Sequence, residues 1–264
     1  MEIEFVKVCG KELSNLTFKI PKGEITGITG HGKTTVLEML DLLIPIKGTI
    51  YFDGKKMLPY QQHRFRQEVV LVSEFFVNQF HLDHIYSYFK YYMMYYHLPI
   101  DNFEDKIKGA FKVVGLSSSL LDKSFSDLCS SDIKLVQLAL AFLSNPKVIL
   151  LDEPFMDFDQ KQERKIIRIL EKLKDKYQKT IVIASNDSDR LYEYTSYLIV
   201  LDDNRVLTEG SVEDVYFSDK KIVQHQIDRP SIVEFIDLVE KKKHIKLAHR
   251  KDVRDVIKDI YRNV

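Results

Sequence analysis

The chain has 264 residues, enough for one or two domains, and its 45% hydrophobic, 11% aromatic and 30% charged residues indicate a globular protein. Lysine plus arginine equals aspartate plus glutamate at 39 each, so no bulk charge attracts nucleic acid or an anionic membrane. Cys9 and Cys129 have neither disulfide nor metal-site spacing, and the chain has neither a signal-peptide pattern nor an apolar run approaching ~18 residues. We therefore expect a soluble intracellular protein that does not bind nucleic acid.

The first third of the chain is predicted to contain strands and turns around one helix. Short apolar or alternating segments favour strands at residues 3–8, 16–20, 24–28, 48–53 and 68–72. From Lys33 the apolar period becomes helical, and this helix is predicted to end before Pro45. Its apolar face contains Val36, Leu40 and Leu43.

Residues 80–143 have an almost entirely helical period and are interpreted as a helical insertion. The segment opens with an aromatic stretch, 86–96, continues with a helix over 103–114, and has a third helix that begins near Ser131. Part of the aromatic stretch is predicted to be helical core, since Tyr88, Tyr92 and Tyr95 share a face with Ile85. The alternative for its outer face is a docking groove for a membrane partner. The spacing of His81, His84 and His97 is too irregular for a metal site.

Strand patterns return in the second half of the chain, at residues 148–151, 181–184, 197–201 and 205–208. An amphipathic helix with Asp159 as its N-cap lies between the first two. Strands alternating with helices indicate an α/β fold with a mostly parallel sheet. After Gly210 the pattern predicts two short helices, with a solvated lysine run, 241–243, between them.

One motif in the first third predicts phosphate binding. Residues 27–34, Gly-Ile-Thr-Gly-His-Gly-Lys-Thr, fit G-x-x-x-x-G-K-[ST] and lie between a predicted strand and a predicted helix. The glycines allow backbone N–H groups to approach the phosphates of ATP closely. We expect Lys33 to reach the β- and γ-phosphates and the Thr34 hydroxyl to bind Mg²⁺.

A second motif completes this constellation. The apolar run 148–151 ends in Asp152 and Glu153, as a buried central strand that delivers a carboxylate to a magnesium ion would. Glu153 is placed to polarise an attacking water. Taken alone an acidic pair after a strand is often only the start of a helix, but together with the first motif the pair favours ATP chemistry.

These motifs resemble the Walker A and Walker B motifs of the ABC-type ATPases, over residues 1–210. Asp152 follows Lys33 by 119 residues with helical segments between them, and Leu128-Cys129-Ser130-Ser131-Asp132 lies where that family has its signature loop. The segment 229–235, Arg-Pro-Ser-Ile-Val-Glu-Phe, is similar to the C-terminal extension of ATP-binding subunits of energy-coupling factor (ECF) transporters.

The resemblance implies a P-loop NTPase (RecA-like) core with a mostly parallel sheet, an antiparallel β subdomain, a helical insertion and a small helical C-terminal extension. The implied divisions are 1–80 with 145–210, 81–144, and 211–264. ATP would be bound by Asp152 together with the first motif, namely Gly27, Thr29, Gly30, His31, Gly32, Lys33, Thr34 and Thr35. Mg²⁺ would be held by Thr34, Asp152 and Glu74, and catalysis would involve Glu153, Asn186 and Glu74.

The chain departs from the family pattern at three places. Serines replace both glycines of L-S-G-G-Q and Asp132 replaces its glutamine, which places a carboxylate near the γ-phosphate held by a partner subunit. The alternative is that Ser131 and Asp132 only cap a helix. Glu74 stands at the glutamine-loop position, and Asn186 at the switch position where the family has histidine. An aromatic residue to stack on adenine is also missing near residues 8–11.

The sequence therefore predicts an ABC ATPase subunit with weakened hydrolysis, peripheral on the cytoplasmic face of the cell membrane. Its expected partners are a second ABC ATPase subunit in a heterodimer and an integral membrane transporter subunit. Two alternatives stay open: the ATPase of a conventional ABC transporter, and a catalytically weak subunit that regulates or braces a heterodimer. Retention of Glu153 favours a working ATPase.

Overall fold

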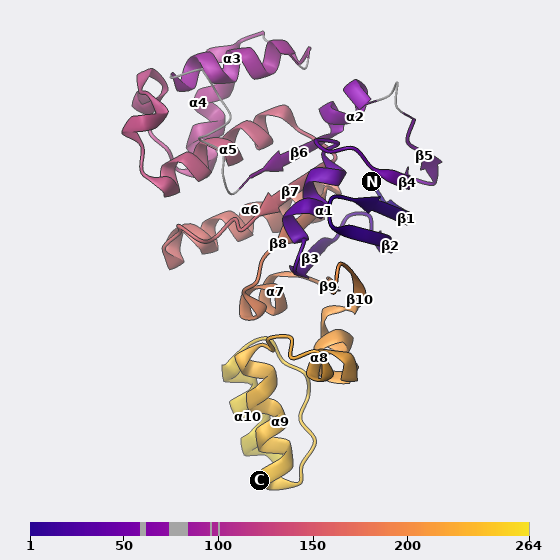
Figure 1. Ribbon diagram of the computed structural model, residues 1–264. Coiled ribbons are helices and arrows are strands. Elements are labelled where there is room, and N and C mark those ends of the chain that lie inside the picture. Colours follow the sequence, from indigo (N-terminus) through magenta and orange to yellow (C-terminus); the bar gives the residue numbers. More distant parts are fainter. Residues whose placement is uncertain (59–61, 74–83, 96, 100, 264) are drawn as a thin grey trace.

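Two sheets form the centre of the molecule in the computed structural model, which describes residues 1–264 except 59–61, 74–83, 96, 100 and 264 (Figure 1). Helices of the middle third lie on one side of the larger sheet, and the C-terminal helices project from the opposite end. The two views show the same separation, so the chain has a central α/β body with a helical part at each end.

The larger sheet is mostly parallel, as expected. Among the described residues it has six strands in the order β10-β9-β3-β8-β7-β6, of which only β10 is antiparallel to its neighbour. Their bounds are Ile25–Gly30 (β3), Val69–Val72 (β6), Val148–Asp152 (β7), Thr180–Ala184 (β8), Tyr197–Asp202 (β9) and Arg205–Ser211 (β10). Because β3, β7 and β8 are adjacent and parallel, their carboxyl ends lie together at one edge, where ligands bind in open α/β sheets.

The smaller sheet is antiparallel and belongs to the first 56 residues. Within the described chain its strand order is β2-β1-β4-β5, with bounds Ile3–Gly10 (β1), Leu13–Ile20 (β2), Lys47–Phe52 (β4) and Lys55–Lys56 (β5). Its apolar face packs with α1 (Lys33–Leu40) and one face of the parallel sheet into one core. The antiparallel β subdomain predicted from the sequence is therefore confirmed.

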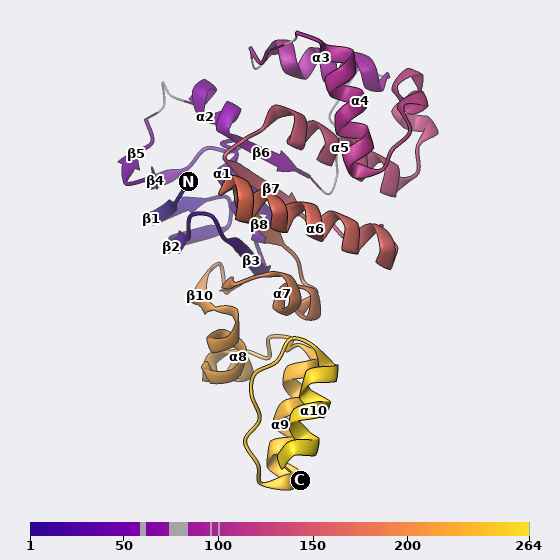
Figure 2. The same ribbon diagram turned by 180° about the vertical axis from the view of Figure 1, so that it is seen from behind.

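Alternating residues of the central strands face two different helical layers. In β8, Val182 and Ala184 belong to the core shared with α1, whereas Ile181 and Ile183 belong to the core shared with α6 (Gln160–Tyr177). Figure 2 shows α6 along the face of the sheet opposite α1. Both faces are buried, which explains the almost continuously apolar strands. The predicted N-cap of α6 is confirmed, because Asp159 accepts a hydrogen bond of 2.7 Å from the backbone of Gln162.

The predicted helical insertion is present. It contains α3 (Ile85–Tyr95), α4 (Phe103–Val114), two 3₁₀ turns (Ser118–Asp122 and Phe125–Asp127) and α5 (Ser130–Ser144). In α3, Ile85 and Tyr88 are buried as predicted, but Tyr95 is 48% exposed and stacks on the exposed Tyr91. The prediction that Tyr95 is core is therefore wrong: in the last turn of α3 the buried residue is Met93, at 2% exposure, and Tyr95 lies with Tyr91 on the exposed side of the helix.

Other elements correct the sequence-based prediction. The helix α1 ends at Leu40, and Leu43 lies beyond it with 49% exposure, because Leu42 has a left-handed backbone conformation with φ +56° that breaks the helix. The lysines 241–243, which are expected between the two C-terminal helices, form the last turn of α9 (Ser231–Lys243), a position that suits cations at a helix C-terminus. The sequence reading missed α2 (Gln62–Glu68), α7 (Ser188–Tyr194), a π-helical turn (Asp214–Ser218) and α8 (Lys220–Gln224).

The C-terminal extension consists of α8, α9 and α10 (Val253–Asn263). Its anchor to the central body includes Ser231, whose N–H and hydroxyl donate to the two oxygens of Asp189 in α7 at 2.6 and 2.9 Å. None of the helices in the described ranges combines the length and apolar character required to cross a bilayer.

Candidate nucleotide-binding site

The loop between β3 and α1 has the geometry of a phosphate cradle. Gly30 and Gly32 have φ values of +97° and +91°, in the left-handed region that favours glycine. A Cβ on Gly30 would lie 2.0 Å from the carbonyl oxygen of Leu201, so this position admits only glycine. Gly32 is the N-cap of α1, has no side-chain capping bond, and the first turn contains no acidic residue. The positive end of α1 is therefore open to an anion.

The residues predicted to bind nucleotide divide into two groups. Gly30, His31, Gly32, Lys33 and Thr34 form the loop and the first turn, and Thr29 immediately precedes them in β3. Two other predicted residues lie differently. Gly27 is buried within β3, where Leu191 and Leu198 pack against it, and the Thr35 hydroxyl donates to Glu12 at 3.0 Å.

Thr34 and Asp152 are brought together at the end of β7. The Thr34 hydroxyl donates to Asp152 Oδ1 at 3.2 Å, and Asp152 is 2% exposed. Hydroxyl and carboxylate oxygens are ligands that Mg²⁺ prefers, usually in sites it shares with phosphate oxygens and water. The two residues present therefore fit a magnesium ion beside the phosphate cradle.

Glu153 lies between the phosphate-binding loop and the loop that follows β8. Its Oε1 is 3.4 Å from Lys33 Nζ and accepts the backbone N–H of Asn186 at 3.0 Å, and its Oε2 accepts the Ser185 hydroxyl at 2.7 Å. Asn186 thus contacts Glu153 through its main chain, and its side chain is exposed. The structure thus brings Lys33, Glu153 and the Asn186 main chain together and places Asp152 beside Thr34, whereas Glu74 lies outside the described residues.

Lys134 of α5 is a site neighbour that sequence reasoning missed. It is 3% exposed, and its ammonium donates to the carbonyl oxygens of Asp152 at 3.3 Å and Ser73 at 3.4 Å. Buried lysines are rare unless they have such partners. A lysine on the apolar face of a predicted helix is the signal that would have found it. It connects α5 to the ends of β6 and β7.

The segment at the signature position begins α5 directly. Cys129 is the N-cap but provides no side-chain capping bond, and Ser130, Ser131 and Asp132 form the first turn. Capping by Ser131 or Asp132 is therefore not what these residues do here. Asp132 puts a carboxylate at a helix N-terminus, which stabilises the helix but opposes an incoming anion. This end of α5 contrasts with the open end of α1.

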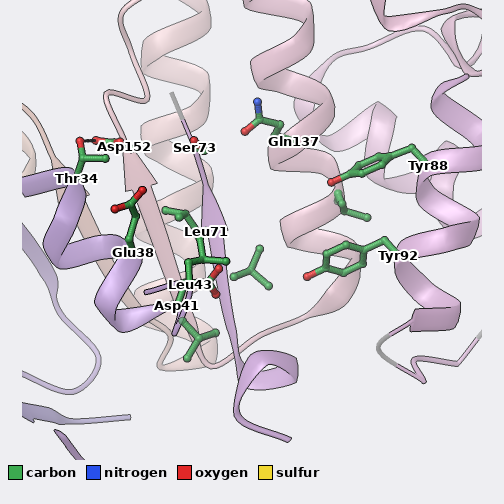
Figure 3. A pocket seen from close by; sticks show the side chains of 13 residues that line it. Thr34, Glu38, Asp41, Leu43, Leu71, Ser73, Tyr88, Tyr92, Gln137 and Asp152 are labelled. Carbon is green, nitrogen blue, oxygen red and sulfur yellow. Dashed lines mark hydrogen bonds between the residues drawn. The ribbon is translucent and has the colours of Figure 1, made fainter. Parts of the chain in front are cut away.

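A cavity of about 160 Å³ extends from Thr34 and Asp152 between α1, β6, α3 and α5 (Figure 3). Tyr88 and Tyr92 point into it from α3 and Gln137 from α5. Within the described part of the chain, no group of three histidine, cysteine or acidic residues could hold a metal ion. Of the three histidines considered in the sequence, His84 and His97 belong to the described residues and His81 does not.

Asp41 at the base of this cavity should make stability depend on pH. Burial raises the pKa of its carboxyl to about 7, against the opposing Arg66 guanidinium, which donates to the carbonyl oxygens of Asp41 and Leu42. The folded state then binds more protons than the unfolded state between about pH 4 and 7, so this contribution to stability is lost as the pH rises through 7.

Asp41→Asn is therefore expected to remove this pH dependence. Between pH 4 and pH 8 its free energy of unfolding should fall by roughly 2–4 kcal/mol less than that of the parent. Denaturant unfolding of both proteins at several pH values measures it, with the exposed Asp175→Asn as a control. Parallel pH profiles for parent and Asp41→Asn would show that Asp41 titrates normally.

Comparisons with known proteins relate the chain to one family and one fold. The ABC transporter family matches residues 13–156. The energy-coupling factor transporter ATP-binding protein EcfA3 of Oenococcus oeni is 28% identical over 94% of this chain and 88% of its own length. An EcfA2 protein of Leuconostoc mesenteroides is also 28% identical, over 90% and 86%.

Among solved structures, cbiO1 of Clostridium perfringens, part of the ABC transporter complex cbiONQ, has a TM-score of 0.69 at 23% identity over 89% of this chain and 98% of that one. The dimeric cassette MJ0796, in a post-hydrolysis state with ADP and Pi, has a TM-score of 0.70 at 21% identity over 80% and 98%. At these identities the solved structures establish the shared fold.

Proposed function

The chain belongs to the ABC transporter family, and from that premise we propose that it is the ATP-binding subunit of an ECF-like transporter, coupling ATP binding and hydrolysis to a membrane partner. The observation that carries this proposal is the convergence of Lys33, Thr34, Asp152 and Glu153 at the carboxyl ends of β3 and β7. The similarity to the ECF subunits extends into the C-terminal extension, since it covers 94% of the chain.

Each of these four residues has a role in the proposed reaction. The N-terminus of α1 and Lys33 bind the phosphates of ATP, and Lys33 exchanges its contact with Glu153 for the phosphate oxygens. Thr34 and Asp152 would hold Mg²⁺, which neutralises phosphate charge when bound. Glu153, fixed by Ser185 and the Asn186 main chain, accepts a hydrogen bond from the attacking water and orients it.

The first turn of α5 supports pairing with a different ATPase subunit. The family resemblance implies that the signature loop of one subunit faces the phosphate site of the other. In a homodimer Asp132 would meet the γ-phosphate at both sites, which is electrostatically unfavourable. A heterodimer gives this chain's phosphate site an intact signature loop. Asp132 equally favours the alternative of a weak bracing subunit, but such a subunit has no need of the three contacts that fix Glu153.

The assembly proposed around this subunit places it at the inner face of the membrane, bound to an integral membrane subunit. We propose the divisions 1–80 with 145–210, 81–144 and 211–264 as the nucleotide-binding core, helical subdomain and C-terminal extension. The exposed stack of Tyr91 and Tyr95 on α3 supports the helical subdomain as a place for partner contact.

Titration of the full chain with ATP, with Mg²⁺ present and then removed by a chelator, tests the proposed function. Saturable binding that weakens when Mg²⁺ is removed is expected, because Thr34 and Asp152 then lose the ion they share with the phosphates. Absence of ATP binding under both conditions would refute the proposal.

Restoring family residues at two positions should raise turnover in the assembled heterodimer. Asn186→His supplies a ring N–H near the γ-phosphate, and Glu74→Gln removes a carboxylate, so the double variant is expected to turn over ATP about tenfold faster. Steady-state ATPase assays measure this, with exposed Asn102→His as a matched histidine control. An unchanged rate would mean that these two positions do not limit hydrolysis.

A further inference from the structure

The carboxylate of Glu153 is held by the segment that follows β8, through a side chain that the sequence reading did not consider. Ser185 donates its hydroxyl to Oε2 at 2.7 Å, and the Asn186 N–H donates to Oε1 at 3.0 Å. Both carboxylate oxygens are thereby fixed by consecutive residues. Hydrogen bonds to an ionised carboxylate are about twice as strong as neutral ones, so this contact is a firm one.

The direction of the Ser185 hydroxyl is itself fixed. Ser185 is 3% exposed, and its N–H donates to the Ile28 carbonyl oxygen of β3 at 3.0 Å. Its Oγ accepts the Asp187 N–H at 3.1 Å. A hydroxyl has a single proton, and since the Asp187 N–H already points at the oxygen, that proton is left for Glu153. The position and orientation of this donor are therefore set by the sheet and by the start of α7.

The backbone of Glu153 shows why such a hold is needed. Its φ is +41°, a left-handed value that is unfavourable for a residue with a side chain. Its N–H donates to the Ala184 carbonyl oxygen at 2.9 Å, so main chain and side chain are both tied to the end of β8. Strained conformations persist at functional sites when several contacts determine them together. The contacts from Ala184, Ser185 and Asn186 do so here.

We propose that Ser185 is a positioning residue for ATP hydrolysis: its buried hydroxyl holds the Glu153 carboxylate in the orientation that serves the attacking water. The proposal rests on the proposed function of this site. It assigns the contacts that hold Glu153 to the Ser185 hydroxyl and the Asn186 main chain, so this positioning does not depend on the side chain at position 186.

Turnover in the assembled transporter complex tests this role. Ser185→Ala is expected to lower kcat about tenfold while KM for ATP stays near the parental value, since Ser185 acts on Glu153 and not on the phosphates. Ser185→Thr keeps a hydroxyl and is expected to recover most of kcat. The matched control is Thr195→Val, which removes another buried hydroxyl, the donor to Leu191 at 2.6 Å, and should leave kcat unchanged. A parental kcat in a folded Ser185→Ala complex would overturn the proposal.

A double-mutant cycle on the full chain provides a test that needs no turnover. The unfolding equilibria of the parent, Ser185→Ala, Glu153→Ala and the double variant are compared by denaturant titration. If the two side chains are hydrogen-bonded, the fold-change in the unfolding constant caused by Ser185→Ala should be at least about fivefold smaller in the Glu153→Ala background than in the parent. Strictly additive effects would show that the two side chains are not bonded. Failure of the parent protein to bind ATP would refute the proposed function, and the result of the cycle could still be interpreted.

Discussion

Lys33→Ala is expected to weaken Mg-ATP binding about 100-fold, or roughly 2.7 kcal/mol, in calorimetric titrations of the full chain. The ammonium lies at the open end of α1, where its charge-assisted bonds to phosphate oxygens have no replacement. The fold should survive the change, because Glu153 keeps its bonds from Ser185 and the Asn186 main chain.

Two further variants make the Lys33 result specific. Lys33→Arg retains the charge but not the compact ammonium, and should bind ATP with intermediate affinity. Lys112→Ala removes an exposed lysine of α4 and should bind like the parent. Equal ATP affinities for Lys33→Ala and the parent would contradict the assignment of this loop to phosphate binding.

Glu153→Gln is expected to lower the ATPase rate of the assembled complex by at least about 100-fold while ATP binding persists. The neutral amide has nearly the same shape, and its oxygen and NH₂ group can bond the Asn186 N–H and the Ser185 hydroxyl. What it loses is the negative charge that orients and polarises water. Single-turnover and steady-state assays separate the chemical step from binding.

The exposed Glu171→Gln of α6 removes the same charge far from the cradle and serves as the control. If the Glu153→Gln complex hydrolysed ATP at the parental rate, Glu153 would have no part in hydrolysis and would only begin the turn after β7. The reading of the chain as a weak bracing subunit would then gain support.

Local sequence rules predicted the parts of this site that lie on single elements. The glycines before Lys33 need left-handed backbone, and the apolar run that ends in Asp152 needs a buried strand, so pattern and structure agree there. The N-cap Asp159 is similarly local. These features follow from the sequence because each depends on residues a few positions apart.

Contacts between elements distant in the chain could not be predicted in the same way. Ser185 and Glu153 are 32 residues apart, and Lys134 reaches Asp152 across 18 residues, so their roles depend on how β7, β8 and α5 pack. The short α7 was missed because its seven residues, Ser188–Tyr194, give too little periodicity. Its start is fixed instead by the Asp187 side chain, which accepts the Arg190 N–H at 2.9 Å.

The most direct test of the proposed function is ATP turnover by the purified chain alone and after assembly with the proposed partner ATPase and membrane subunit. Asp132 would face the phosphates at both sites of a homodimer, whereas Lys33, Asp152 and Glu153 are in place to work opposite an intact signature loop. We expect Mg-ATP binding with almost no hydrolysis by the chain alone, and hydrolysis in the complex at a rate that Glu153→Gln in this chain lowers. Rapid hydrolysis by the isolated chain, or a complex whose ATPase rate is unchanged by Glu153→Gln, would contradict the proposed function.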